Sequence, residues 1–103
     1  MIRRRRFADV IRRQLELFER ENAQLIRDCE LAERAYDDSV RDEAEERYGD
    51  YMDLVETGTE ALAELRDSFA STLDEETAEE YEEAFNRAVA KRLPRFALEI
   101  EDL

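Results

Sequence analysis

A repeating pattern of apolar and small side chains runs through the first third of the chain. Between Ile11 and Tyr36 they recur in alternating steps of four and three residues, a spacing that places them on one stripe only in an α-helix. A stripe that repeats about every 3.5 residues needs a second helix lying along it. We therefore expect a long helix with a helical partner. The stripe comprises Ile11, Leu15, Phe18, Asn22, Leu25, Cys29, Ala32 and Tyr36.

A second stripe follows, and a polar break separates it from the first. The break is Asp37, Asp38 and Ser39, where Asp38 or Ser39 can cap the start of a new helix. Folding the chain back at this break pairs the two stripes, with large side chains facing small ones near the turn. The alternative is one uninterrupted helix through the break. The second stripe comprises Ala44, Tyr48, Tyr51, Val55, Gly58, Leu62, Leu65, Phe69 and Thr72.

These patterns predict an all-α fold: a long antiparallel helical hairpin plus a shorter third helix. The 103 residues include only two glycines and one proline, and 44% are charged, which is typical of long helices with charged outer faces. A chain of this length forms a single domain with one modest core. The expected parts of this domain, residues 1–103, are a basic segment 1–6, helices 7–37, 40–73 and 75–93, and a C-terminal tail 95–103.

One layer of the expected hairpin differs from the others, because it places Asn22 opposite Gly58. A buried asparagine lowers stability but fixes the register of two helices, and a glycine beside it leaves room for the amide or a water. We interpret the pair as a register pin. The alternative is a small ligand-binding notch at the same layer.

The first helix carries apolar surface on a second side. Val10, Leu17 and Leu31 recur at multiples of seven residues, away from the main stripe. Because one partner helix cannot cover both sides, we expect the third helix or a second copy of the chain to cover this strip, and we predict a homodimeric helical bundle. Phe96 and Ile100 in the tail are further candidates for contact with a partner. The sequence thus favours a protein-interaction, assembly or adaptor module.

The composition argues against catalysis. Histidine is absent, which removes the most common general acid or base and metal ligand. The two glycines are isolated, so a glycine-rich phosphate loop is excluded. The single cysteine, Cys29, falls on the apolar stripe and is interpreted as a small buried hydrophobe. We expect no enzymatic activity, no cofactor, and neither a catalytic nor a metal site.

The charge is large and unevenly distributed. The net charge is −13, yet residues 1–13 carry six arginines and one aspartate. The acidic body disfavours contact with nucleic acid or anionic lipid, since both would repel it. Because no apolar run reaches the roughly 20 residues that span a bilayer, we expect a cytoplasmic protein. The N-terminal basic patch is Arg3, Arg4, Arg5 and Arg6.

Three alternatives to the interaction module remain open. The basic patch could bind nucleic acid or an acidic partner. The acidic body could mimic DNA and occupy the groove of a basic protein. Glutamates at helical spacing, such as Glu43 with Glu46 and Glu76 with Glu80, could form a carboxylate-only metal site in a helical bundle.

Overall fold

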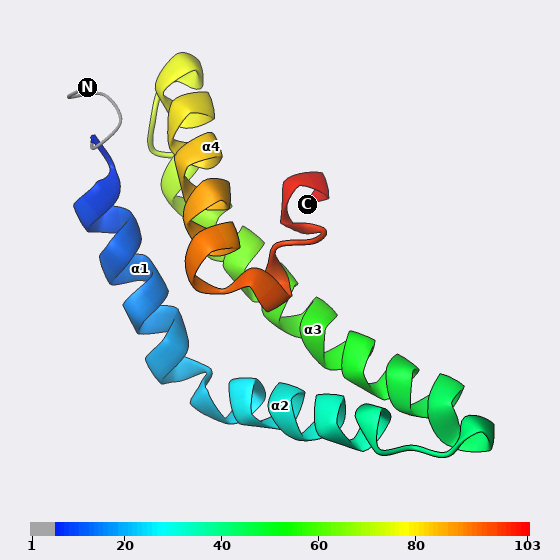
Figure 1. Ribbon diagram of the computed structural model, residues 1–103. Coiled ribbons are helices and arrows are strands. Elements are labelled where there is room, and N and C mark those ends of the chain that lie inside the picture. The colour runs from blue at the N-terminus through cyan, green and yellow to red at the C-terminus, as the bar shows by residue number, and fades with distance from the viewer. Residues whose placement is uncertain (1–5) are drawn as a thin grey trace.

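The computed structural model describes residues 6–103, and all regular structure in this range is helical (Figure 1). The all-α class expected from the sequence is therefore confirmed. Residues 6–103 form four α-helices and two short 3-10 helices, and the structure measures 51 × 24 × 23 Å. The helices are α1 (Ala8–Glu21), α2 (Ala23–Asp37), α3 (Arg41–Ala70), α4 (Glu75–Arg92), η2 (Pro94–Phe96) and η3 (Ile100–Asp102).

Asn22 divides the helix expected over residues 7–37 into α1 and α2. Its backbone angles, φ −117° and ψ 28°, are not helical, and its Nδ2 donates to the Phe18 carbonyl at 3.0 Å. An amide side chain that bonds to nearby backbone in this way competes with the helix and favours its end. The chain changes direction at this point (Figure 1), so α1 lies against α4 while α2 lies along α3.

The chain reverses after α2 and returns as α3, which is the longest helix. Ser39 Oγ donates to the Tyr36 carbonyl at 2.7 Å, and Val40 has extended backbone before α3 begins. The break between the two helices therefore comprises Asp38, Ser39 and Val40. α2 and α3 run in opposite directions side by side (Figure 1).

The start of α4 is set by a side-chain cap. An oxygen of the Asp74 carboxylate accepts a hydrogen bond from the Thr77 backbone N–H at 3.3 Å, which satisfies a donor that has no partner within the helix. The hydrogen bonds from Thr77 hold the pKa of Asp74 below its usual range. Glu75 and Glu76 occupy the first turn, where the helix dipole favours negative charge.

The core lies where α4 packs against α1 and α3. The Tyr81 ring is fully buried, with its centroid 4.7 Å from that of Phe69 and 5.4 Å from that of Phe7. The Tyr81 hydroxyl donates to Gln14 Oε1 at 2.9 Å, so this buried polar group has a partner on α1. The largest fully buried side chains are Tyr81, Phe85, Phe96, Leu15, Leu62, Ile100, Val89 and Cys29.

The C-terminal tail belongs to this core, which corrects the expectation that Phe96 and Ile100 contact a partner. Each is only 1% exposed. The Phe96 ring meets Phe18 edge to face, with centroids 5.7 Å apart, where α1 ends. The bend at Asn22 separates α1 from α2, and Phe96 packs beside Phe18 where α1 ends, while the last turn of the tail, with Ile100, lies against α3.

Gly58 and Asn22 have separate roles, so the structure also corrects their interpretation as one register pin. Gly58 lies against the Phe96 ring, and a methyl group at this position would overlap the ring. Glycine is therefore required here because an aromatic side chain approaches the helix backbone closely. The Asn22 amide bonds to its own helix at Phe18 instead.

We expect the stability of the protein to fall at alkaline pH because of Tyr81. Burial raises the pKa of Tyr81 from 10.0 to about 12. In the unfolded chain the Tyr81 hydroxyl ionises near its ordinary pKa, whereas in the folded chain it keeps its proton to a higher pH. The resulting stabilisation is complete below pH 10 and is lost as the pH rises through 12; it amounts to about 2–3 kcal/mol. Denaturant unfolding between these pH values measures it.

The matched control is Tyr81→Phe, which removes the ionisable group and keeps the ring. Its stability should decline less steeply over the same pH range. If the free energy of unfolding fell equally steeply with pH in both proteins, Tyr81 would not be the cause of the alkaline sensitivity.

Candidate protein-interaction surface

The outer ends of α2 and α3 extend beyond the core as a two-helix arm, residues 30–54 (Figure 1). Cys29 and Val55 are buried at its base, and between them no residue of this fully described stretch is buried. Every side chain of the arm therefore has contact with solvent. Burial raises the pKa of the Cys29 thiol, as expected for a structural cysteine.

Large apolar side chains are exposed on this arm. Leu31 is 59% exposed and Val40 62% exposed, and Tyr36 and Tyr48 are also exposed with ring centroids 5.3 Å apart. Single exposed apolar residues are ordinary, whereas large contiguous apolar patches are typical of interaction surfaces. The other exposed large apolar side chains of residues 6–103 are Leu17, Leu98 and Leu103.

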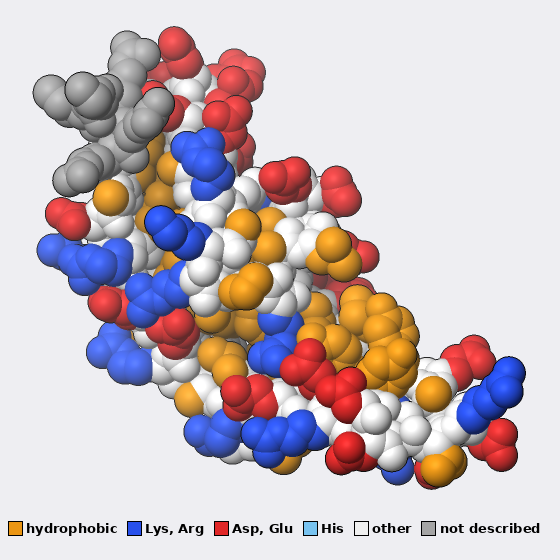
Figure 2. Space-filling view, in the orientation of Figure 1, with side chains coloured by type: hydrophobic (Ala, Val, Ile, Leu, Met, Phe, Trp, Pro, Cys, Tyr) orange, Lys and Arg blue, Asp and Glu red, His pale blue; other side chains and the backbone are white. Residues whose placement is uncertain are grey.

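An apolar cleft of about 250 Å³ lies where the arm meets the tail. Hydrophobic side chains gather in this region on the face shown in Figure 2. Leu98, at 81% exposed, projects from the tail at the edge of the cleft, which continues the apolar surface of α3. The cleft is lined by Tyr48, Tyr51, Met52, Val55, Glu56, Thr59, Arg95, Leu98 and Glu99.

Arg95 fixes the tail to both helices of the arm. Its Nε donates to the Tyr51 hydroxyl at 3.2 Å, and its guanidinium also donates to Glu33 Oε1 at 2.9 Å. Tyr51 belongs to α3 and Glu33 to α2, so one side chain connects three segments. These hydrogen bonds therefore fix one side of the cleft without a bound partner.

The arm is strongly acidic. Residues 30–54 contain ten aspartates and glutamates and three arginines, a net charge of −7. These charges surround the exposed apolar side chains. Such a surface is complementary to apolar side chains flanked by lysine or arginine.

The three residues of the predicted strip no longer form one surface. Val10 and Leu17 lie on α1 and Leu31 on α2, because the helix ends at Asn22 between them. Val10 is partly buried against the core, while Leu17 is 37% exposed. Of the strip, only Leu31 belongs to the arm.

Sequence reasoning placed Tyr48 in a buried stripe and did not identify Leu98 as part of a site. The sequence feature that could have identified Leu98 is the short apolar tail after Pro94, in which every second residue is apolar. Phe96 and Ile100 enter the core, whereas Leu98 remains in solvent.

The basic patch is only partly described. Arg6 donates to Glu80 on α4 at 3.2 Å, so its charge meets an acid of the same chain. Arg3, Arg4 and Arg5 lie outside the described residues.

Within residues 6–103, no three or more Asp, Glu, Cys or His residues gather in a way that could hold a metal ion. None of the described helices contains a stretch long and apolar enough to cross a membrane. Comparison of the chain with protein-family models, curated proteins and solved structures finds no match in any of the three.

Proposed function

We propose that the chain is a non-catalytic protein-interaction module whose arm binds a basic amphipathic helix of a partner protein. The observation that carries this proposal is the group of exposed apolar side chains on an acidic two-helix arm that the core does not cover. Leu31 and Val40 lose contact with water only when another molecule covers them. Burial of such side chains contributes about 1.5–3 kcal/mol each to association.

A helix suits this surface for geometric reasons. α2 and α3 lie side by side and present ridges of side chains along their length, against which a third helix packs. The cleft beside Tyr48 and Leu98 accepts an apolar anchor from the partner, as in helix-in-groove recognition. Lysines or arginines flanking that anchor would meet the −7 charge of the arm.

A second copy of the chain is the competing occupant. A dimer in which two arms pack together as a four-helix bundle would be the homodimeric helical bundle that the sequence predicts, and it would cover the same apolar side chains. It would also bring two surfaces of charge −7 together, which repel each other. The charge therefore favours a basic partner over a dimer formed through the arms.

We expect a synthetic helical peptide of leucine and lysine to bind the intact protein, and the variant Leu31→Gln with Tyr48→Gln to bind it about tenfold more weakly. The substitutions remove apolar contact and leave the charge of the arm unchanged, so a weaker complex reports apolar docking rather than attraction between charges. Fluorescence anisotropy of the labelled peptide measures both affinities.

Leu17→Gln is the matched control, because Leu17 is exposed on α1 outside the arm. It should leave the affinity unchanged. Equal affinity of the arm variant and the intact protein would overturn the proposal. A dimer by sedimentation that the arm substitutions dissociate would replace the basic partner with a second copy of the chain.

A further inference from the structure

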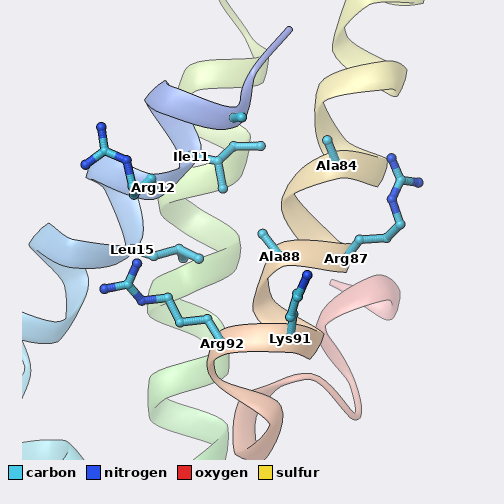
Figure 3. A pocket seen from close by; sticks show the side chains of 9 residues that line it. Ile11, Arg12, Leu15, Ala84, Arg87, Ala88, Lys91 and Arg92 are labelled. Atoms are coloured by element: carbon cyan, nitrogen blue, oxygen red, sulfur yellow. The ribbon is translucent and has the colours of Figure 1, made fainter. Parts of the chain in front are cut away.

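A groove of about 390 Å³ lies between α1 and α4, away from the arm (Figure 3). Both helices contribute apolar and basic side chains to it. It is lined by Ala8, Ile11, Arg12 and Leu15 of α1 and by Ala84, Arg87, Ala88, Lys91 and Arg92 of α4.

The floor of this α1/α4 groove is apolar because of the residues that face each other across the helix pair. Ile11 and Leu15 are buried residues one turn apart on α1 (Figure 3). Opposite them, Ala84 and Ala88 are one turn apart on α4, and their small side chains leave the space between the helices unfilled. The result is a shallow channel with a hydrocarbon surface.

The rim of the groove is positive, although the protein as a whole carries a net charge of −13. Four of its sixteen basic residues lie here. Arg92 forms two hydrogen bonds to Glu19, at 2.8 and 3.1 Å, and Arg12 pairs with Glu16. Arg87 and Lys91 have no carboxylate within ion-pairing distance among residues 6–103.

We propose that the α1/α4 groove binds a medium-chain fatty acid. The acyl chain lies along the groove against Ala84 and Ala88, which are only partly buried, and the carboxylate accepts hydrogen bonds from Arg87 and Lys91. These two cations are one helical turn apart and are free to meet an anion at the edge of an apolar surface.

The lining favours this ligand over other anions. Proteins bind single-stranded nucleic acid largely through aromatic side chains on which bases stack, and the residues that line the groove include no aromatic side chain. The volume lies near the lower end of the range for small-molecule sites, about 300–1,000 Å³. A helix of another protein needs a longer surface than this.

Isothermal titration calorimetry with decanoate, below its micelle concentration, tests the proposal on the full chain. We expect saturable binding at one site. Octanoate, which lacks two methylene groups, should bind about fifteenfold more weakly, since each buried methylene contributes about fourfold. The variant Arg87→Gln with Lys91→Gln should bind decanoate about tenfold more weakly, as expected for two partly exposed ion pairs.

Two further variants make the result specific. Arg13→Gln with Arg20→Gln removes the same two charges from exposed positions of α1 outside the groove and should retain the affinity. Ala88→Leu fills the floor and should abolish binding while thermal unfolding shows a folded protein. Absence of saturable decanoate binding would overturn the proposal, as would equal weakening by the two charge variants. Binding of oligodeoxythymidylate in place of decanoate would overturn it as well.

Discussion

Replacing Phe96 with alanine should lower the free energy of unfolding by about 3–5 kcal/mol, the range found when a large aromatic side chain is removed from a core. Phe96 is 1% exposed and contacts Phe18 on α1 and Gly58 on α3. Its removal leaves a cavity where three segments meet, and the tail loses its first anchor. Chemical denaturation monitored by circular dichroism measures the change. A loss below about 1 kcal/mol would show that the tail does not belong to the folded core.

Gly58→Ala gives an independent test of the same contact. In the natural chain the added methyl group overlaps the Phe96 ring, so the substitution should destabilise the protein. In the Phe96→Ala background the ring is absent, and alanine should instead stabilise α3 by about 1 kcal/mol through its higher helix propensity. The sign of the effect therefore reverses. Equal effects in the two backgrounds would contradict the close approach of ring and helix.

The glycine at position 49 provides the matched control. No heavy atom lies within 4 Å of a methyl group built at Gly49. Gly49→Ala should therefore stabilise the protein in both backgrounds, because it changes helix propensity alone.

The class of fold and several core residues follow from periodicity. Ile11, Leu15 and Phe18 are buried as the first stripe predicts, and the chain turns after Asp37. Both results depend on local patterns, which the sequence displays directly: the spacing of apolar residues along a helix, and polar residues that favour a helix end.

The packing of these elements does not follow from periodicity. Asn22 occupies a stripe position, so the spacing continues through it, yet its amide bonds to Phe18 and the helix ends. A seven-residue repeat describes a continuous surface only if the helix is continuous. The end at Asn22 therefore lets α1 pack against α4, while only its last turn, at Phe18 and Glu21, stays beside α3.

The candidate site depends on these long-range contacts. Whether Leu98 is exposed and Ile100 buried is decided by how the tail meets α3, over a separation of some forty residues in sequence. The same holds for the α1/α4 groove, since Ile11 and Ala88 line one groove only where α1 packs against α4. Helical periodicity reports which side of a helix is apolar, but not which element covers that side.

Arg66 is the residue that holds the end of the tail, and no sequence pattern identifies it. It lies on α3 beside the stripe residue Leu65, where a charged side chain is normally interpreted as solvent-exposed. In the structure it is 4% exposed. Its guanidinium donates to the Ile100 carbonyl at 2.9 Å, to Asn86 Oδ1 at 3.0 Å and to Asp67 Oδ1 at 2.8 Å. One side chain thus connects α3, α4 and η3.

We expect Arg66→Met to lower the free energy of unfolding by about 3 kcal/mol. Methionine replaces the apolar stem but not the donors, so the Ile100 carbonyl and the Asn86 amide lose their hydrogen bonds in a buried place, at about 1–3 kcal/mol for each unsatisfied group. Hydrogen exchange should show residues 97–103 losing protection while α1 to α4 retain theirs. Arg66→Lys keeps the charge but cannot donate to three acceptors in one plane. Its free energy of unfolding should lie between those of the unsubstituted protein and Arg66→Met. An unchanged stability together with a protected tail would mean that Ile100 alone holds the segment in place.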